Sequence, residues 1–495
     1  MLLTDVIKDL SYKLVQGELH REVQAIAYDS RIVEENGLFV AISGFSADGH
    51  QFIDKAVALG AKTIIVEKDV TVSPEITVLR VADTRKALAR VASNFYHRPT
   101  EQMNLIGITG TNGKTSTTYF IKSIFEQTNT SIGIIGTIGT VIGEKVIQNK
   151  NTTPESLNLQ QIFADMIESH TKHCMMEVSS HALNLNRVAH SSFNTGVYTN
   201  LTPDHLELHR TMEEYFEAKA MLFELTTDYN IINADDEYGR VLIDRLKGRR
   251  VKLVTYAIEQ DADIYASDIH YFADHTFYTV HTPKGSVEIK VNLPGAIYVY
   301  NSLAAIATAY CNQFTLQQIA DGIAAVKGIK GRLEVVYQDE DNKIIVDFAH
   351  TEDSLAKALS TIRPFAKGRI ILVFGVYASE DDTGTAKRRG MAKVAATLAD
   401  FSVVTSDNPK EQDNNLIIRE IVEGMEAYNG AYEAVIDRRD AIAFAIDISR
   451  KDDVILIAGK GHETSQVVGK TEIPFNEAEI VRELMDKRDK KLTAR

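Results

Sequence analysis

Cysteine is nearly absent from this sequence, which holds only Cys174 and Cys311 among its 495 residues. Two cysteines exclude a disulfide framework, so both are expected to be buried, small apolar residues. Because disulfide-poor proteins are typical of reducing compartments, this scarcity predicts a cytoplasmic protein.

Long apolar segments are also missing, since no stretch approaches the roughly 18 consecutive apolar residues of a membrane-spanning helix. Residues 1–9 mix acidic with apolar side chains and lack a basic region ahead of an apolar core, which argues against a secretory signal. Low-complexity segments and short repeats are absent as well. We therefore expect a soluble globular chain without membrane insertion.

Positive charge is in the minority: 54 lysines and arginines stand against 68 aspartates and glutamates, a formal net charge of −14. Nucleic-acid-binding domains are usually basic, so this balance argues against a nucleic-acid partner. It still leaves room for local basic pockets that bind phosphates.

A glycine-rich turn at residues 110–116 has the features of a phosphate-binding loop. An apolar run at 105–109 predicts a buried strand before it, and apolar spacing from 115 onward predicts a helix after it. Gly110 and Gly113 let backbone N–H groups converge on phosphate oxygens, Lys114 reaches the outer phosphates, and the Thr115 hydroxyl can hold Mg²⁺. The glycine spacing is irregular, because Ile108 stands where the usual pattern begins with glycine, and a turn without a ligand is the alternative.

The length predicts several domains, because a single hydrophobic core seldom grows beyond about 250–300 residues. Apolar runs alternate with helical stretches, a pattern typical of α/β folds with parallel sheets. We predict an α/β protein with three domains: a smaller N-terminal α/β domain at 1–101, a central P-loop ATPase-like parallel sheet at 102–332, and a C-terminal Rossmann-like, doubly wound sheet at 333–495. The main predicted helices lie at 51–59, 115 onward, 212–225, 301–310 and 353–362.

Polar side chains follow several of the predicted strands, where open α/β sheets place their ligands. Glu177 ends an apolar run and is a candidate Mg²⁺ ligand, although a solvent-exposed strand end is the alternative. Lys219 lies among apolar residues of the predicted helix 212–225. It is either a surface lysine with a buried stem or a lysine held near the nucleotide. The turns at 28–31 and 44–50 are candidate ligand sites as well, or plain turns.

Several motifs occur in a fixed order, at residues 110–115, 177–181, 200–205, 301, 331–334 and 347–350. This ordered set resembles the Mur ligases and covers nearly the whole chain. Within that family, the motifs at 151–155, 407–409 and 459–463 are similar to the ligases that add the third residue of the peptidoglycan stem peptide.

The resemblance implies a role for each matching residue. Lys114, Lys219, His205 and Arg332 would be catalytic. ATP would contact Gly110, Thr111, Asn112, Gly113, Lys114, Thr115, Ser116, Asn301, Arg332 and Asp347. Mg²⁺ would lie near Thr115, Glu177, His205 and a carbamylated Lys219. The UDP-N-acetylmuramoyl dipeptide would contact Ser30, Phe45, Ser46, Ala47, Asn151, Thr152, Thr153, Ser179 and Arg187. The added diamino acid would contact Asp407, Asn408, Pro409, Lys410, Gly459 and Glu463.

The chemistry that the resemblance implies is a two-step amide synthesis. ATP phosphorylates a carboxylate of the substrate to an acyl phosphate, and the amine of the diamino acid then displaces phosphate. Cations and Mg²⁺ offset the negative charge that builds up, so no side-chain nucleophile is required. We expect a monomer that uses ATP and Mg²⁺ as cofactors.

The sequence departs from the family pattern at three places. Ile297 and Tyr298 replace a Phe-Asn pair, and either Glu380 or Thr383 stands where these ligases usually carry an arginine. Lys410 replaces the arginine of ligases specific for meso-diaminopimelate. Because a cation at 410 would repel the ammonium group of lysine, we predict meso-diaminopimelate, with L-lysine as the alternative.

Other functions stay open at this point. A folylpolyglutamate-synthase-like ligase shares the central ATP domain, although the separate N-terminal domain argues against it. A catalytically impaired, nucleotide-binding paralogue with a scaffold or regulatory role would also fit the departures at 298, 376–383 and 410. Turnover with candidate amino acids discriminates among these possibilities.

Overall fold

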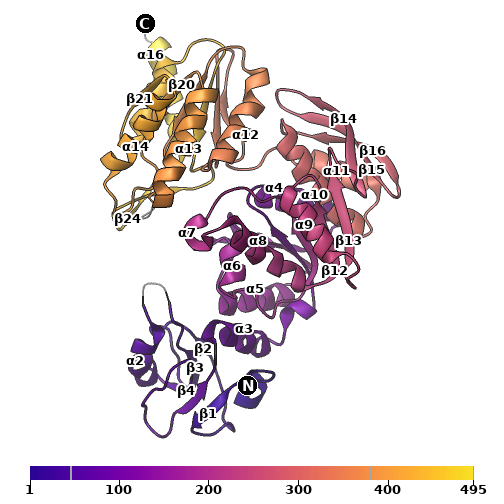
Figure 1. Ribbon diagram of the computed structural model, residues 1–495, viewed down its shortest axis with the longest axis vertical. Helices are drawn as coiled ribbons and strands as arrows, with labels where there is room; N and C mark the ends of the chain where they lie inside the picture. The colour runs from indigo at the N-terminus through magenta and orange to yellow at the C-terminus, as the bar shows by residue number, and fades with distance from the viewer. Residues whose placement is uncertain (45–46, 379–381, 494–495) are drawn as a thin grey trace.

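The computed structural model describes residues 1–44, 47–378 and 382–493, and within these residues three large sheets follow one another along the chain (Figure 1). The N-terminal and C-terminal regions lie at opposite ends of the molecule, with the central region between them. The predicted α/β class with three sheet-bearing regions is confirmed. Each sheet lies inside one predicted domain, whereas the boundaries near 101 and 332 stay predictions.

The N-terminal sheet has the strand order β1-β5-β4-β3-β2, with β1 antiparallel to its neighbour and the other strands parallel. Its inner strand β4 is buried on both faces, because Ile65 packs in one apolar cluster and Ile64 and Val66 pack in another. Asp83 caps α3 by accepting hydrogen bonds from the backbone N–H groups of residues 85 and 86. The elements are α1 (Leu3–Val6), β1 (Lys13–Gln16), β2 (Ile26–Ala27), β3 (Gly37–Val40), η1 (Gly49–Phe52), α2 (Ile53–Ala58), β4 (Ala61–Val66), β5 (Thr77–Arg80) and α3 (Thr84–Phe95).

The central sheet has the order β16-β15-β14-β13-β12-β11-β6-β10-β7-β8-β9, parallel from β14 to β7 and antiparallel at both ends. Its elements are η2 (Pro99–Glu101), β6 (Asn104–Thr109), α4 (Lys114–Glu126), β7 (Ile132–Gly136), β8 (Gly139–Ile142), β9 (Lys145–Ile147), α5 (Ser156–Glu168), β10 (His173–Glu177), α6 (Ser180–Asn184), β11 (Phe193–Tyr198), α7 (Leu206–His209), α8 (Met212–Ala220), η3 (Met221–Glu224), β12 (Thr226–Asn233), α9 (Glu237–Leu246), β13 (Lys252–Ala257), β14 (Ile264–Tyr271), β15 (Thr276–Thr282), β16 (Gly285–Val291), α10 (Ala296–Cys311) and α11 (Leu316–Ala325). Strand β6 lies between β11 and β10, so the turn after it opens at the middle of the sheet.

The C-terminal sheet has the order β17-β18-β22-β19-β20-β21, with only β17 antiparallel to its neighbour among the described strands. Helices α12–α14 and helices α15–α16 belong to separate apolar clusters, as expected for a sheet covered on both faces. The elements are β17 (Glu334–Gln338), β18 (Asn342–Asp347), α12 (Glu352–Ile362), η4 (Arg363–Phe365), β19 (Ile370–Phe374), α13 (Asp382–Leu398), β20 (Phe401–Val404), α14 (Asn414–Ala427), β21 (Tyr432–Ala434), α15 (Arg438–Ile448), β22 (Asp453–Ala458), β23 (Ser465–Val468), β24 (Thr471–Pro474) and α16 (Glu477–Thr493).

Three predicted helices differ from the structure in extent. The helix expected at 51–59 is the end of the 3₁₀ turn η1 followed by α2, which ends at Ala58. The helix expected at 212–225 is α8 followed by the 3₁₀ turn η3, so the α-helical part ends at Ala220. The helix expected at 301–310 is longer, because α10 already begins at Ala296, directly after Gly295. Gly295 has a backbone φ of +101°, a conformation that side chains disfavour, and this fixes the start of the helix.

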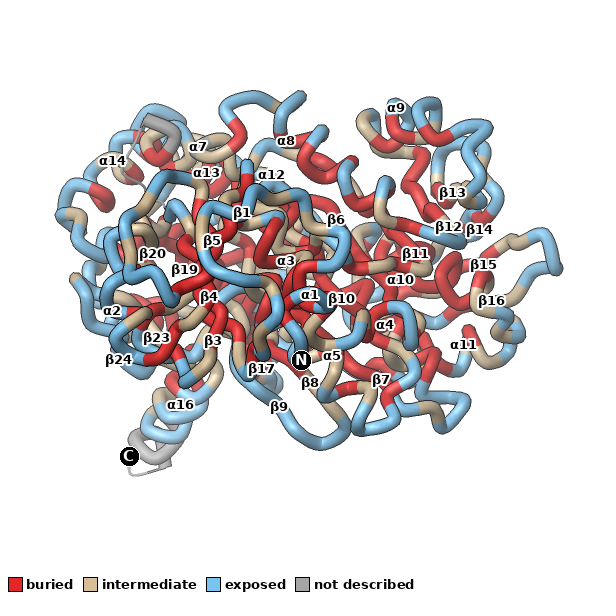
Figure 2. Tube along the Cα trace, turned by 90° about the horizontal axis from the view of Figure 1, so that it is seen from below, coloured by how far each residue is buried: buried red, intermediate tan, exposed pale blue. Residues whose placement is uncertain are grey.

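Burial follows the sheets, and the buried part of the trace concentrates in their strands and inner helices (Figure 2). Cys174 and Cys311 are both buried, as predicted. Within the described ranges, every helix is too short or too polar to cross a bilayer.

Candidate active site

The phosphate loop joins β6 to α4 and is shaped by its two glycines. Gly110 has φ +145° and Gly113 has φ +89°, values that favour glycine. A Cβ at Gly110 would also lie 1.8 Å from the hydroxyl of Thr199, so a side chain there has no room. Lys114 begins α4, and its Nζ donates to the carbonyls of Gly110 and Thr111, each at 2.9 Å. Burial lowers the pKa of this amine.

Lys219 reaches the same loop from α8. Its side chain is only 1% exposed, and its Nζ donates to the Gly110 carbonyl at 2.9 Å and lies 4.4 Å from the centre of the Tyr215 ring. Among the described residues, no carboxylate pairs with this amine. Burial and the nearby charge of Lys114 lower its pKa well below the ordinary value. The interpretation of Lys219 as a surface lysine is therefore wrong, and the alternative position beside the loop is the one observed.

Glu177 lies beside the loop at the end of β10, where it is 1% exposed and hydrogen-bonded. Its Oε2 accepts from the hydroxyls of Thr115 at 3.0 Å and Thr137 at 2.9 Å, and the backbone N–H of Thr137 donates to Oε1. The solvent-exposed alternative for Glu177 is thus wrong. Thr137 is a site residue that the sequence did not reveal, because it follows a glycine-interrupted strand without any motif of its own.

The group formed by Glu177 and Thr115 fits a hard cation such as Mg²⁺. The described residues contain no group of three or more His, Cys, Asp or Glu side chains that could hold a metal ion. Mg²⁺ in nucleotide sites usually takes only one or two carboxylates and completes its shell with phosphates and water. The Glu177 carboxylate and the Thr115 hydroxyl, which are already in contact, match that donor set.

His205 and its neighbour Asp204 face the C-terminal region across the site. His205 adopts a left-handed backbone conformation, φ +53°, and its Nε2 lies 3.4 Å from Asp204. Lys387 of α13 lies 3.4 Å from the same carboxylate and 2.8 Å from the Tyr377 hydroxyl. Burial opposes ionisation of Asp204, but the charges of His205 and Lys387 outweigh it and hold its pKa below the ordinary value. No local pattern predicts this contact, because it joins residues 183 positions apart.

Arg332, Asp347 and Asn301 complete the wall opposite the loop. Arg332 donates to the Thr115 hydroxyl at 3.2 Å and lies over the Phe348 ring, 4.6 Å from its centre. Asp347 accepts from the backbone N–H groups of residues 333 and 349, at 2.6 and 2.8 Å, and burial raises its pKa. The Asn301 amide oxygen is so close to Gly113 that an added Cβ would lie 2.3 Å away.

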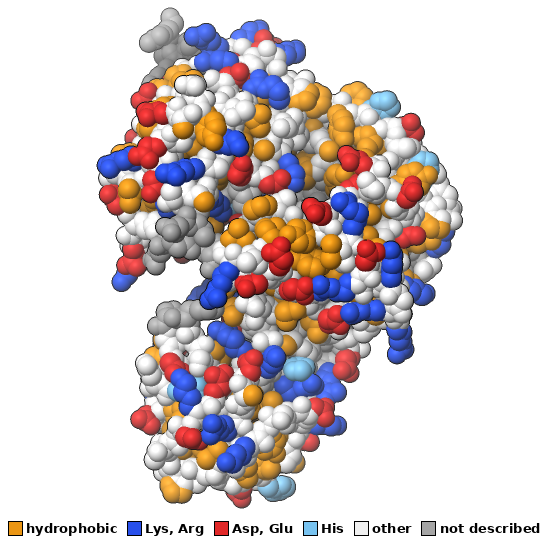
Figure 3. Space-filling view, viewed as in Figure 1, with side chains coloured by type: hydrophobic (Ala, Val, Ile, Leu, Met, Phe, Trp, Pro, Cys, Tyr) orange, Lys and Arg blue, Asp and Glu red, His pale blue; other side chains and the backbone are white. Residues whose placement is uncertain are grey.

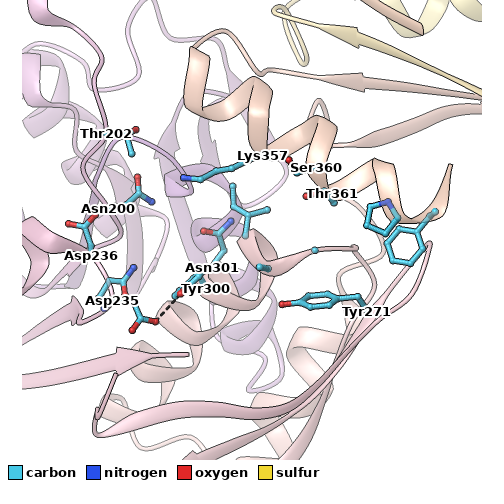
Figure 4. Close-up of a pocket in the computed structure, with 16 residues that line it drawn as sticks. Asn200, Thr202, Asp235, Asp236, Tyr271, Tyr300, Asn301, Lys357, Ser360 and Thr361 are labelled. Atoms are coloured by element: carbon cyan, nitrogen blue, oxygen red, sulfur yellow. Dashed lines mark hydrogen bonds between the residues drawn. The ribbon is translucent and has the colours of Figure 1, made fainter. Parts of the chain in front are cut away.

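Two adjoining cavities lie between these walls. One, of about 260 Å³, is lined by the phosphate loop together with Glu177, His205 and Arg332. The other, of about 610 Å³, extends past Asn301 and Lys357, which line both (Figure 4). In the larger cavity, the Tyr300 hydroxyl donates to Asp235 at 2.8 Å. Ser116 is buried in the first turn of α4, and Tyr298, one of the departures from the family pattern, is buried beside Arg332.

The residues expected to bind the dipeptide lie next to Glu177. Thr153 donates its hydroxyl to the Glu177 carbonyl at 2.8 Å and accepts from the backbone N–H of Ser179. Arg187 donates to the Thr153 carbonyl at 3.0 Å and pairs with Glu155 at 2.8 Å. Thr152 lines the smaller cavity, whereas Asn151 is exposed.

The residues expected to bind UDP border a separate N-terminal cavity of about 600 Å³. Ser30 and Ala47 line it, together with Arg85 and Glu155, which sequence reasoning missed. Phe45 and Ser46 lie outside the described residues. The molecule is hollowed between its N-terminal and C-terminal regions (Figure 3).

The candidate amino-acid site lies at the ends of β20 and β22. Lys460 is fully buried, and its Nζ donates to Glu463 at 2.6 Å and to the Asn408 amide oxygen at 3.0 Å. Gly459 has φ +122°, and an added Cβ would lie 2.7 Å from the Asp407 carboxylate. Lys460 was not among the predicted site residues, although it lies in the sequence between Gly459 and Glu463, which were both expected to contact the amino acid.

The remaining members of the amino-acid set are less tightly held. Pro409 is buried, whereas Lys410 is exposed and left-handed, φ +50°, with its backbone N–H bonded to the Val467 carbonyl. Glu380 lies outside the described residues, and so does the side chain of Thr383. The predicted ligand contacts of all these residues stay predictions.

Comparison with known proteins gives matches along the whole chain. Three family descriptions match in succession: "Mur ligase family, catalytic domain" at 22–96, "Mur ligase middle domain" at 108–309, and "Mur ligase, glutamate ligase domain" at 331–461. The UDP-N-acetylmuramoyl-L-alanyl-D-glutamate–2,6-diaminopimelate ligase of Clostridioides difficile (strain 630) is 42% identical over 487 residues, which cover 98% of this chain and 100% of the relative.

Two further matches have the same name. The ligase of Alkaliphilus metalliredigens (strain QYMF) is 41% identical over 484 residues, covering 98% of this chain and 97% of the relative. A solved structure of a UDP-N-acetylmuramoyl-L-alanyl-D-glutamate–2,6-diaminopimelate ligase superposes with a TM-score of 0.70 at 27% identity and covers 99% of both chains.

Proposed function

The chain belongs to the Mur ligase family, and from this premise we propose that it adds 2,6-diaminopimelate to UDP-N-acetylmuramoyl-L-alanyl-D-glutamate, with ATP converted to ADP. The product would be a precursor of peptidoglycan, made in the cytoplasm. The observation that carries the proposal is the convergence of the phosphate loop, Glu177 and Arg332 around one cavity, with Lys219 hydrogen-bonded to the loop at Gly110. The N-terminal family match at 22–96 favours this function over a folylpolyglutamate-synthase-like activity.

ATP would bind across the two adjoining cavities. Its phosphates would replace the loop carbonyls as partners of Lys114, which has no carboxylate partner among the described residues. Its adenosine would extend past Asn301 into the larger cavity. Glu177 and the Thr115 hydroxyl would hold Mg²⁺, which supplies Lewis-acid polarisation of the phosphoryl group when bound.

In the first step, a carboxylate oxygen of the dipeptide attacks the γ-phosphorus of ATP, ADP leaves, and an acyl phosphate forms. In the second, the amine of diaminopimelate attacks the acyl carbon, loses a proton and displaces phosphate. In the first step the transferred phosphoryl group and the departing ADP carry the negative charge, and in the second step the charge develops on the oxygen of the tetrahedral intermediate and on the departing phosphate. Lys114, which contacts the Gly110 carbonyl, and Arg332, which contacts the Thr115 hydroxyl, would offset that charge.

Lys219 is suited to modification by carbon dioxide. A neutral amine can attack the carbon of CO₂ and lose a proton to give a carbamate, whereas an ammonium ion cannot. The buried position lowers the pKa of Lys219 and so favours the neutral amine. The carbamate would carry negative charge beside the phosphate loop, where Lys219 contacts Gly110, and could serve as an oxygen ligand of a hard cation.

The amino-acid site is suited to a ligand that carries both positively and negatively charged groups. Lys460 is neutralised by Glu463, and Asp407 lies against Gly459, so the site offers donors and acceptors together. The exposed ammonium of Lys410 would favour a distal carboxylate and disfavour the side chain of L-lysine. Lysine addition is the alternative within the same chemistry.

Amino-acid-dependent formation of ADP tests this function. The full chain is incubated with ATP, Mg²⁺ and the UDP-linked dipeptide, and meso-diaminopimelate, L-lysine or no amino acid is added. We expect ADP only when meso-diaminopimelate is present. ADP with L-lysine alone would support the alternative substrate, and tight binding of ATP and dipeptide without ADP from any amino acid would support a scaffold or regulatory paralogue.

A further inference from the structure

A fully buried ion pair lies beneath the candidate amino-acid site. Arg438, the first residue of α15, and Glu477, the first residue of α16, are both 0% exposed. The Nε of Arg438 donates to Oε1 of Glu477 at 2.7 Å. Both residues lie outside every motif discussed above.

The rest of the Arg438 guanidinium joins two strand ends. Nη1 donates to the carbonyl of Ser406 at 3.1 Å, and Nη2 donates to the carbonyl of Ala458 at 2.8 Å. Ser406 directly precedes Asp407, and Ala458 directly precedes Gly459. One planar, rigid group therefore spans the two backbone segments that carry the candidate ligands of the amino acid.

Stability alone does not account for this pair. Removing two charges from water costs more than their attraction usually returns, and apolar residues of similar volume often serve a core equally well. Oε2 of Glu477 is also buried without a hydrogen-bond partner among the described atoms, so the pair is not fully satisfied. Such an arrangement is better explained by the geometry that it imposes.

We propose that Arg438 is a positioning residue, held by Glu477, which fixes the spacing between the segment at 406–410 and the segment at 459–463 and thereby sets the affinity for the amino-acid substrate. The identity of that substrate rests on the proposed function, whereas the spacing does not. Lys460 also joins these two segments, because its Nζ donates to the Asn408 amide oxygen at 3.0 Å. The spacing between the segments is therefore held by two side chains, Arg438 and Lys460.

The neighbouring pair provides a matched control. Arg439 and Glu483 join the same helices, α15 and α16, at 2.5 Å, but their side chains are 40% and 57% exposed. Exposed pairs contribute little to stability, and among the described residues the only hydrogen bond of this pair's side chains is the one that joins them to each other. Changes at Arg439 and Glu483 should therefore leave the amino-acid site unaltered.

The test compares Arg438→Lys and Glu477→Gln with Arg439→Lys and Glu483→Gln in the full chain. Lysine keeps the charge of Arg438 but cannot reach both carbonyls in one plane, and glutamine keeps the shape of Glu477. We expect KM for the amino acid to rise about tenfold or more in Arg438→Lys, the scale of losing one or two charge-assisted hydrogen bonds. KM for ATP and for the dipeptide should stay within about twofold of wild type.

Hydrogen–deuterium exchange gives a readout that needs no turnover. Backbone amides at 406–411 and 459–463 should exchange faster in Arg438→Lys, with the rest of the chain and both control variants unchanged. If Arg438→Lys does not fold, Glu477→Gln decides the matter with the same two measurements. Equal KM values and equal exchange in these segments, or a rise in all three KM values together, would overturn the proposal. A wild-type chain without amino-acid turnover would refute the proposed function. The exchange data alone would then show whether Arg438 holds the segments 406–410 and 459–463 at a fixed spacing.

Discussion

The two walls of the candidate active site hold their buried cations in opposite ways. On the phosphate-loop wall, Lys114 and Lys219 donate to backbone carbonyls, and among the described residues neither amine has a carboxylate partner. On the amino-acid wall, Lys460 and Arg438 are paired with Glu463 and Glu477. Between the two walls, Lys387 of the C-terminal region pairs with Asp204 of the central region.

This difference corresponds to the charge of the ligand that each wall would take. Unpaired, desolvated amines retain their full attraction for a triphosphate, and one of them can lose its proton and be modified. Paired cations leave a nearly neutral surface, which suits a zwitterionic amino acid. Replacing one cation at a time on either wall tests whether this difference in pairing matters for ligand binding.

Loss of Lys219 should have the largest effect. We expect Lys219→Ala to lower kcat on the order of 10³-fold, comparable to removal of one strong electrostatic contact to a transition state. Short carboxylates such as formate or acetate should restore part of the activity, because they can take the place of the carbamate. The readout is the rate of ADP formation with and without added carboxylate.

Lys247→Ala is the matched control for that variant, since Lys247 lies on the same domain with its side chain 65% exposed. It should retain wild-type turnover. Full activity in Lys219→Ala would contradict the role of a carbamate.

Loss of Lys460 should come next. Lys460→Met removes a buried cation that donates to Glu463 and Asn408, which should cost about 1.5–3 kcal/mol of stability, because the Glu463 side chain is 34% exposed and keeps part of its hydration. Urea unfolding measures this cost, and KM for the amino acid should rise with it. Lys470→Met, at a side chain 84% exposed, should change neither quantity. An unchanged KM in Lys460→Met would separate Lys460 from the amino-acid site.

His350 should control part of the acid sensitivity of the region between the two walls. Burial and the charge of Lys387 lower the pKa of His350 to about 4. Between that value and the ordinary pKa of about 6.5, the unfolded chain binds a proton that the folded chain does not, so stability falls as the pH falls. The loss should reach about 2–3 kcal/mol near pH 4.5.

His350→Gln should remove most of this loss, measured as a smaller shift of the urea-unfolding midpoint between pH 7 and pH 4.5. His20→Gln, at an exposed histidine, should keep the wild-type shift. Identical shifts in His350→Gln and wild type would show that His350 is not held neutral by the fold.

Lys410→Arg should have the smallest effect of these changes. A guanidinium grips a carboxylate through two hydrogen bonds, so KM for meso-diaminopimelate should fall about three- to tenfold. KM for ATP should not change. Lys451→Arg, at a side chain 69% exposed and far along the chain, is the control. A higher KM for meso-diaminopimelate in Lys410→Arg would show that Lys410 does not face the distal carboxylate.

The sequence predicted what depends on neighbouring residues. The phosphate loop, with β6 before it and α4 after it, follows from apolar spacing and two glycines within one short stretch. The placement of Glu177 at a strand end follows from the rule that parallel strands present their carboxyl ends to ligands. These features were predicted because local pattern alone determines them.

Contacts between distant segments could not be predicted in the same way. The periodicity of α8 shows that one face is buried, but not that Lys219 lies on that face beside Gly110, 109 positions earlier in the chain. The contact of Asp204 with Lys387 spans two domains and has no local signature. Arg438 and Glu477 each begin a helix and read as ordinary charged helix starts.

Competition between two amino acids measures directly which of them the chain adds to the dipeptide. The full chain is incubated with ATP, Mg²⁺, the UDP-linked dipeptide and equal concentrations of meso-diaminopimelate and L-lysine. Mass spectrometry then identifies the product by its mass. The account predicts a product that carries meso-diaminopimelate in large excess over one that carries lysine. A product that carries lysine alone, or ATP turnover without any joined product, would contradict it.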